Sequence, residues 1–325
     1  MIYDKVLGNI NEGKFGRNQG LPNGFDRINQ FIFGVQKGTY YVIGGEPGTG
    51  KSALVDHMFM YSPFNYLSTL NKEKELKILY FSLELSKEIK ITKAIARRIY
   101  DKHNIVTDVN YILSRGKNRV SSQMYDLVKK ERDYFQKLED RIVMLDGSFS
   151  PGDIKMQLDK YFLSNKDNKY NIIIIDHIGL IKATSNQKKA AIDEVSRQLV
   201  FYRNQYNCIP VVVQQLNRTM SSIDRFKLDR VEPQLSDFKD TGNTQEDANI
   251  VLSIFSPLRY KLDTYRGYNV NMLKDRFRAM GVLKNRDGEA DKVIGIKFLG
   301  EMGYFKELPI PSLMTDEDYD KIIKT

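Results

Sequence analysis

One short segment constrains the fold of this chain more than any other. The residues from Gly45 to Ser52 read Gly-Glu-Pro-Gly-Thr-Gly-Lys-Ser, and they stand between an apolar β-rich run, Tyr40 to Ile43, and a helical pattern that starts near Lys51. The glycines of this turn allow backbone N–H groups to point inward at the start of the helix. The segment therefore predicts a strand that turns directly into a helix, which is the first half of a βαβ unit.

The spacing G-x-x-x-x-G-K-S is also the pattern of a phosphate-binding loop. Inward N–H groups and the partial positive charge of a helix N-terminus both favour an anion. Lys51 is expected to reach the β- and γ-phosphates, and Ser52 is expected to ligate Mg²⁺. The position between a strand and a helix disfavours an ordinary glycine-rich turn. We predict that a Mg²⁺-nucleotide binds through Gly45, Glu46, Pro47, Gly48, Thr49, Gly50, Lys51 and Ser52.

Short apolar runs alternate with helical patterns along most of the chain, which is typical of a parallel sheet. Ile172 to Ile175 is continuously apolar, as expected of a central strand buried on both faces. Pro63 is expected to end the helix that starts near Lys51. Ser86 and Ser150 are predicted to cap two further helices, the second through a capping box. Further elements are predicted as strands at Ile78 to Phe81, Ile142 to Leu145 and Pro210 to Val213, and as a helix from about Ala190 to Tyr206.

Later apolar runs predict strands that extend the sheet as antiparallel edge pieces. The stretch 217–243 lacks periodicity, and such a long loop in a compact domain is usually functional. The sequence shows no internal repeat. The prediction is an α/β fold with a mainly parallel central sheet, flanking helices and edge strands at Ile250 to Phe255, Gly281 to Leu283, Val293 to Phe298 and Tyr304 to Glu307.

Composition excludes several other classes of protein. Hydrophobic residues make up 41% and charged residues 28% of the 325 positions, which excludes disordered and fibrous chains. No apolar run approaches the roughly 18 residues that span a bilayer. We therefore expect a cytoplasmic location and no membrane partner. The single cysteine, Cys208, is predicted to be a packed thiol. The net charge of +9 favours a polyanionic partner, although codon bias toward lysine would produce the same charge.

Several polar residues follow predicted strands at the edge where a nucleotide would lie. Asp176 directly follows the central strand; many buried strands end in Asp as a turn residue, but a neighbouring phosphate-binding loop favours coordination of a metal-bound water. Glu84 is expected at the same edge, although by itself it is one of 41 acidic residues. Gln215 either senses the γ-phosphate or is a turn residue. His177 either contacts the γ-phosphate or stacks beside Asp176.

Several separated segments together resemble one family, the DnaB-type replicative helicases, and in particular their C-terminal ATPase core. The resemblance covers about Gly20 to Leu308 and is more specific than a phosphate-binding loop alone. The segments occur in the family's order and are 21–26, 81–86, 175–177, 215–218, 236–242, 245–248 and 284–288.

The resemblance implies a RecA-like P-loop ATPase core that forms a homo-hexamer around single-stranded DNA, moves 5′ to 3′ and unwinds the duplex at a replication fork. ATP and Mg²⁺ would be its cofactors, and a primase and a helicase loader its further partners. It assigns Lys51 and Ser52 to Mg-ATP, Glu84 to the catalytic base, Asp176 to the metal and Gln215 to γ-phosphate sensing.

Two further groups of residues take roles from the resemblance. Lys284 and Arg286 match a pair that reaches the ATP site of the neighbouring subunit, while a charged strand end is the alternative interpretation. Lys239, Asp240 and Gly242 match a central-channel loop that holds the DNA backbone. Such contacts carry no base information, so binding is expected to be sequence-tolerant and sensitive to salt.

The sequence departs from the family in three places. Only about twenty residues precede the core, so the family's N-terminal domain is expected to be absent. We predict a linker or docking segment at 1–19, a helicase ATPase domain at 20–308 and a C-terminal tail at 309–325. The apolar stripe of Ile2, Val6, Leu7 and Ile10 is expected to dock on the adjacent subunit. Glu46 and Asn249 also differ from common family residues, and neither change removes a catalytic role.

The sequence leaves three functional hypotheses, and the first is favoured. The chain is a replicative DNA helicase driven by ATP, a RecA-like DNA-dependent ATPase that serves recombination or loading without unwinding, or a ring component that binds nucleotide only to assemble. The presence of Lys51, Glu84, Asp176 and Arg286 argues against the third.

Overall fold

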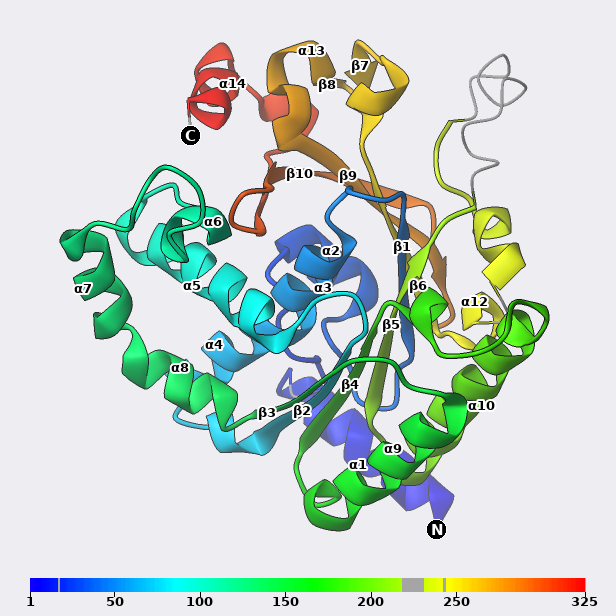
Figure 1. Ribbon diagram of the computed structural model, residues 1–325. Helices are drawn as coiled ribbons and strands as arrows, with labels where there is room; N and C mark the ends of the chain where they lie inside the picture. Colours follow the sequence, from blue (N-terminus) through cyan, green and yellow to red (C-terminus); the bar gives the residue numbers. More distant parts are fainter. Residues whose placement is uncertain (17, 218–230, 242–243, 325) are drawn as a thin grey trace.

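The computed structural model describes residues 1–16, 18–217, 231–241 and 244–324 of the protein. A nine-stranded sheet forms its centre, in the order β11-β10-β9-β6-β1-β5-β4-β2-β3 (Figure 1). The six strands from β3 to β6 in this order run parallel to one another. These strands are β1 (Tyr41–Gly45), β2 (Leu76–Ser82), β3 (Ile142–Asp146), β4 (Tyr170–Asp176), β5 (Ile209–Gln215) and β6 (Ile250–Phe255).

The other end of the sheet is antiparallel. β9 pairs with β6 in the opposite direction, and β10 and β11 continue this pattern to the sheet edge. The predicted α/β class, the mainly parallel sheet and the antiparallel edge pieces at β9, β10 and β11 are thereby confirmed. The expectation that Ile250 to Phe255 is an edge piece is wrong, because this segment is β6, which pairs in parallel with β1 inside the sheet. The three added strands are β9 (Phe277–Asn285), β10 (Lys292–Leu299) and β11 (Tyr304–Glu307).

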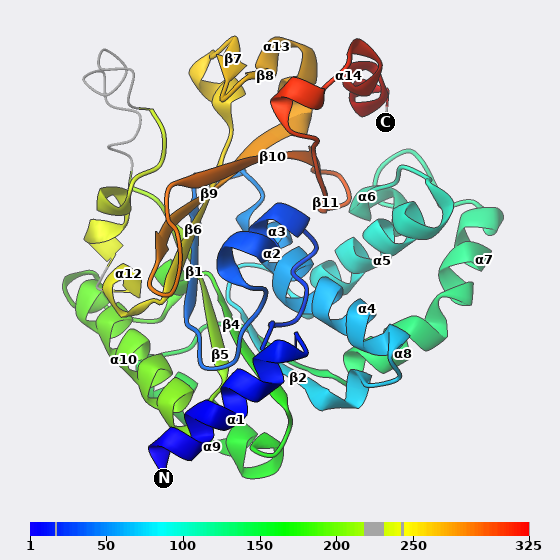
Figure 2. The same ribbon diagram turned by 180° about the vertical axis from the view of Figure 1, so that it is seen from behind.

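Alternate side chains of each parallel strand enter two different cores, because successive residues of a strand point to opposite faces. Ile173 and Ile175 of β4 pack in one core, and Ile172 and Ile174 pack in the other. The first face is covered by α9 (Pro151–Asn165) and α10 (Lys188–Tyr206) (Figures 1 and 2). The second is covered by α2 (Asp26–Ile32), α3 (Lys51–Val55), α4 (Ser62–Thr69), α5 (Lys87–His103) and α8 (Arg132–Glu139).

Local capping signals form as the sequence predicts. The Ser86 hydroxyl accepts a hydrogen bond from the backbone N–H of Ile89, and Ser150 forms a reciprocal capping box with Asp153. Cys208 is buried, and burial raises the pKa of its thiol to about 12. The expectation of a packed thiol is confirmed.

The prediction that Pro63 ends the helix after the phosphate-binding loop is wrong. The helical path continues from α3 through a π-helical segment, η1 (Asp56–Tyr61), into α4, which ends only at Thr69. Proline lacks an N–H and clashes with the carbonyl one turn earlier in a regular helix. The wider π turn lies directly before Pro63, which then occupies the start of α4, where an N–H is not needed.

Smaller elements surround the two layers. A two-stranded ribbon, α13 and α14 lie together at the top of the molecule in Figure 1, and α14 packs through Tyr319 and Ile322 on the core of the first face. The smaller helices and strands are α6 (Val109–Ile112), α7 (Ser122–Lys130), α12 (Thr244–Asp247), α13 (Val270–Leu273), α14 (Asp316–Ile323), β7 (Thr264–Tyr265) and β8 (Tyr268–Asn269). The 3₁₀ turns are η2 (Glu73–Glu75), η3 (Ile178–Leu180), η4 (Ser185–Gln187), η6 (Leu235–Thr241), η7 (Pro257–Tyr260), η8 (Lys274–Arg276) and η9 (Pro311–Leu313).

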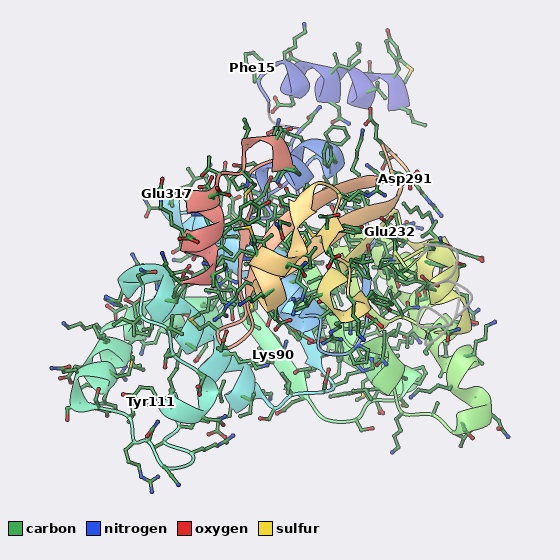
Figure 3. All side chains as sticks on the ribbon, turned by 90° about the horizontal axis from the view of Figure 1, so that it is seen from above. Phe15, Lys90, Tyr111, Glu232, Asp291 and Glu317 are labelled. Atoms are coloured by element: carbon green, nitrogen blue, oxygen red, sulfur yellow. The ribbon has the colours of Figure 1, made fainter. Side chains whose placement is uncertain are left out.

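The N-terminal helix α1 (Ile2–Lys14) projects from the body, with Phe15 beyond its end (Figure 3). The apolar side chains of its stripe, Ile2, Val6, Leu7 and Ile10, are between 46% and 84% exposed. No helix in the described part of the chain is both long and apolar enough to cross a membrane.

Candidate nucleotide site

The phosphate-binding loop connects β1 to α3 at the carboxyl edge of the parallel strands. Gly48 and Gly50 have φ values of 70° and 102°, a backbone conformation that favours glycine. A Cβ atom on Gly45 would lie 2.7 Å from a methyl group of Ile254 on the neighbouring strand. Glycine is therefore required here both for the turn itself and for the close approach of β1 to β6.

The interior of this loop is held by its own polar groups. Thr49 is buried, and its hydroxyl donates to the Glu46 carbonyl at 2.8 Å. The Lys51 ammonium donates to the same carbonyl at 2.8 Å. The Glu46 carboxylate accepts a hydrogen bond from Tyr260. Within the predicted nucleotide set, Pro47, Gly48, Gly50, Lys51 and Ser52 line the cleft, whereas Gly45, Glu46 and Thr49 do not.

Ser52 and Asp176 come together although they are far apart in the sequence. The Ser52 hydroxyl donates to Asp176 Oδ1 at 2.8 Å, and Asp176 is only 1% exposed at the end of β4. Burial by itself would raise the pKa of Asp176, but the Lys90 ammonium and hydrogen bonds from Lys90, Ser52 and Tyr80 hold it below its usual value. The lowered pKa favours the charged carboxylate form of Asp176.

This pair fits Mg²⁺ by the chemistry of its donors. Mg²⁺ takes oxygen ligands and is usually held by one or two protein groups together with phosphates and water. The Ser52 hydroxyl and the Asp176 carboxylate are such groups, next to a loop built for phosphate. In the described part of the chain, no cluster of three or more His, Cys, Asp or Glu side chains forms a separate metal cage.

Glu84, Gln215 and His177 also line this cleft, which has a volume of about 410 Å³. Glu84 is exposed in the loop after β2, and that loop is anchored where the Leu83 N–H donates to the Asp176 carbonyl at 2.7 Å. Gln215 is the last residue of β5. Burial lowers the pKa of His177, which favours a neutral imidazole. The predicted convergence of these side chains at one edge of the sheet is thus observed, while their catalytic roles stay predictions.

Lys284 and Arg286 lie away from this cleft. The Arg286 N–H donates to the Asn249 carbonyl, five residues before Ile254, which is the β6 residue paired with Gly45. At roughly 3.3 Å per strand residue, this places Arg286 about 17 Å along the sheet from the phosphate-binding loop. Both side chains instead donate to the Glu246 carbonyl.

The structure describes the predicted DNA-binding residues less completely than the other predicted site residues. Gly242 lies outside the described residues, as do the side chains of Lys239 and Asp240. The backbone of Lys239 and Asp240 belongs to η6, which follows β5 beyond the undescribed stretch. Their role stays a prediction.

The structure places further residues around the candidate site, and the sequence analysis missed them. Lys90 and Asp56 are buried beside Asp176 and line the cleft. Arg278 of β9 donates to the Thr49 carbonyl, and Arg259 donates to the Pro47 carbonyl, so both brace the phosphate-binding loop. A weak signal existed for Lys90, because Lys90, Ala94 and Arg97 fall on one face of a helix at spacings of four and three. Neither arginine had a local signal, since both reach the loop from more than 200 positions away.

This fold and site define a class of protein. A phosphate-binding loop after a central parallel strand, with a charged carboxylate two strands away and a glutamate at the same edge, is the arrangement of P-loop proteins that bind nucleoside triphosphates.

Comparison with known proteins identifies the family within this class. The family model described as DnaB-like helicase C terminal domain matches residues 20–307, and the chain belongs to this family. The replicative DNA helicase DnaB of Mycoplasma pneumoniae is 28% identical over 85% of this chain and 54% of that protein. The DnaB of Helicobacter pylori is 27% identical over 75% of this chain and 45% of that protein. The chain spans about half the length of the curated relatives that it matches.

Solved structures share the fold. One solved ATPase domain matches with a TM-score of 0.73 and 18% identity, covering 95% of this chain and 99% of that one. A DnaB-like replicative helicase, solved in a study of its interactions with primase, matches with a TM-score of 0.72 and 18% identity, covering 94% of this chain and 66% of that one. The RecA-like architecture expected from the sequence is confirmed.

Proposed function

We propose that this chain is the motor of a replicative DNA helicase, which hydrolyses ATP with Mg²⁺, assembles as a homo-hexamer and moves 5′ to 3′ on single-stranded DNA. Family membership supports the class of activity. The observation that carries the proposal is the division of the site. Lys51, Ser52 and Glu84 line one cleft and Ser52 donates to Asp176, while Arg286 lies about 17 Å from the phosphate-binding loop along the sheet. Such a site is complete only between two copies of the chain.

Within one chain, each residue has a role that its position allows. Lys51 would bind the β- and γ-phosphates, and Ser52 and Asp176 would hold Mg²⁺, which when bound offsets the negative charge of the phosphates. Glu84 would accept a proton from the attacking water, because it faces the cleft from the loop tied to Asp176. Gln215 would report the γ-phosphate to the segment that follows β5. Lys284 and Arg286 would serve the neighbouring copy's nucleotide.

We further propose that the strand of DNA is held by its phosphates through Lys239, Asp240 and the backbone near Gly242. The net charge of +9 supports a polyanionic ligand. Replacing Lys239 with Ala is expected to weaken single-strand binding and to lower the slope of log affinity against log salt by about 1, while basal ATPase stays nearly unchanged. Loss of nucleotide binding in this variant would instead contradict the assignment of Lys239 to the DNA-binding loop of the channel.

The division into a docking segment at 1–19, an ATPase domain at 20–308 and a C-terminal segment at 309–325 is part of the proposal. The exposed apolar stripe of α1 supports docking on another subunit. A primase is proposed as a partner because one matched helicase was solved in a study of its interactions with primase. A helicase loader is a further proposed partner, and replication of DNA would place the protein in the cytoplasm.

A forked DNA substrate tests the activity directly. Strand release is expected only with ATP and Mg²⁺, only from forks with a free 5′ single-stranded arm, and not with Lys51→Ala, which lacks the phosphate ligand. DNA-stimulated ATPase without strand release would favour the recombination or loading role. Absence of both activities in an assembled ring would leave only nucleotide-dependent assembly.

A further inference from the structure

Lys90 occupies an unusual position for a lysine. It is 3% exposed in the first turn of α5, and it lies toward the middle of the molecule in Figure 3. Its ammonium contacts Asp176 Oδ2 at 2.9 Å and Asp56 Oδ2 at 3.2 Å, and it also donates to the Tyr80 hydroxyl. These groups form a buried cluster of Lys90, Asp56, Tyr80 and Asp176, which we call the Lys90 cluster.

The Lys90 cluster divides the two oxygens of Asp176. Oδ2 faces Lys90 and the Tyr80 hydroxyl, which donates at 3.1 Å, while Oδ1 faces Ser52. The carboxylate is therefore held through Oδ2, and Oδ1 remains beside Ser52, the second predicted Mg²⁺ ligand, which lines the cleft. Preorganisation of this kind comes from groups that orient the ligands of a metal.

The Lys90 cluster also joins three parts of the site. Asp56 comes from the π turn after the phosphate-binding helix, Asp176 ends β4, and Lys90 belongs to the helix capped by Ser86, two residues after Glu84. A π turn inside a helix frequently marks a functional position. One lysine thus links the phosphate-binding helix, the metal carboxylate and the segment that carries the predicted base.

Stability alone is a weak reason for such a cluster. Taking charges out of water costs free energy that their mutual attraction only partly returns, so apolar residues of similar size are often equally stable. The cluster holds two carboxylates against one ammonium. Burial raises the pKa of Asp56, and the Lys90 charge lowers it only in part. A role in orienting Asp176 explains why these charges are buried better than a role in stabilising the fold does.

We propose that Lys90 is a positioning residue, which holds Asp176 by Oδ2 so that Oδ1 and Ser52 are already aimed at Mg²⁺ before the metal-nucleotide arrives. The inference rests on the proposed function, because it takes Asp176 as the metal carboxylate. Lys90 itself does not touch the nucleotide or the metal in this role.

The test measures binding of a fluorescent nucleotide, mant-ADP, to the full chain as Mg²⁺ is titrated, with melting temperature recorded in EDTA. The informative variant is Lys90→Met combined with Asp56→Asn, because it removes Lys90 while leaving the summed charge of the cluster unchanged. The Mg²⁺ concentration at half-maximal binding is expected to rise about tenfold, since metal sites lose 10- to 100-fold when an orienting partner is removed. Affinity in EDTA is expected to stay within about twofold.

Two matched controls isolate the role of Lys90. Asp56→Asn alone keeps the contact of Lys90 with Asp176, and Lys87→Met removes an exposed lysine of the same helix. Both are expected to keep the Mg²⁺ midpoint within about twofold, because neither releases Asp176 Oδ2. A shift in Asp56→Asn as large as in the double variant would overturn the proposal.

The remaining outcomes are equally decisive. An unchanged midpoint in a folded double variant would make Lys90 merely structural, and a lower midpoint would make it a competitor of the metal. Should the double variant not fold, Lys90→Arg keeps the charge but changes the donor geometry, and an unchanged midpoint there would overturn the proposal. If nucleotide binding by the unaltered protein does not depend on Mg²⁺ and Asp176→Asn has no effect on it, the proposed nucleotide site itself is wrong. The role of Lys90, which rests on that site, is then overturned with it.

Discussion

At the scale of single residues, Lys51 combines burial with a proposed task, phosphate binding, that needs its charge. Burial lowers the pKa of Lys51 to about 8, and the neighbouring carboxylates of Glu84 and Asp176 offset this only in part. A bound polyphosphate favours the ammonium form. Below the folded pKa the residue is already charged, so binding takes up no proton there. Above it, binding requires a proton, and affinity falls as the pH rises.

We expect the affinity for mant-ADP to decrease about tenfold between pH 7 and pH 9, because each unit above the pKa costs about a factor of ten. Fluorescence titrations at fixed Mg²⁺ measure this profile. Lys51→Arg is the control, since a guanidinium does not lose its proton in this range and its profile should be flat. A flat profile in the unaltered protein would show that Lys51 is not the group that binding protonates.

At the scale of elements, strand β9 has two ends with different tasks. Its first residues brace the phosphate-binding loop through Arg278, and its last residues carry Lys284 and continue to Arg286 at the other edge of the sheet. Because β9 runs antiparallel to β6, one strand serves its own nucleotide site at one edge and presents cations at the opposite edge. This geometry predicts that hydrolysis needs two chains.

Mixing two inactive variants tests this prediction. Arg286→Ala chains retain Glu84, and Glu84→Gln chains retain Arg286, so some interfaces of a mixed ring would hold both. In equal mixtures about a quarter of the interfaces are complete, and ATPase is expected to recover to about that fraction of normal. A mixture of Lys51→Ala with Glu84→Gln should recover nothing, because both defects lie in the same half of the site. Failure of the first mixture at every ratio would count against a shared site.

At the scale of the whole molecule, assembly is the property on which the proposed function depends. Helix α1 exposes its apolar stripe and projects from the body, so a neighbouring subunit is the surface that we expect it to cover (Figure 3). Leu7→Asp combined with Ile10→Asp is expected to reduce the hexamer fraction about tenfold in native mass spectra, because the charges cannot be buried without partners.

The melting temperature of that variant should change little, since α1 contributes exposed rather than buried side chains. Gly8→Asp adds a charge on the opposite face of the same helix, where a Cβ would meet nothing within 4 Å, and it serves as the control. Hexamers of normal abundance in the double variant would contradict the prediction that α1 contributes to the interface between subunits. Assembly lost equally in the control would point to net charge rather than to the apolar stripe.

Much of this architecture followed from local sequence alone. The turn from β1 into α3, the apolar run of β4 and the helix caps at Ser86 and Ser150 depend on residues within one or two turns of one another, so periodicity and glycine placement were sufficient to predict them. The convergence of Glu84, Asp176 and Gln215 also followed, because parallel strands end at a common edge.

Only the tertiary structure decided which distant side chains meet. In the sequence, Lys90 is one more lysine of a predicted helix. Only the orientation of α5 in the folded chain shows that it points inward, toward Asp56 and Asp176. Pro63 reads as a helix end until the π turn accommodates it. The distance of Arg286 from the phosphate-binding loop depends on the direction of β9 in the sheet. Local chemistry sets the elements, whereas strand order and helix rotation bring residues together, and these depend on packing of the whole chain.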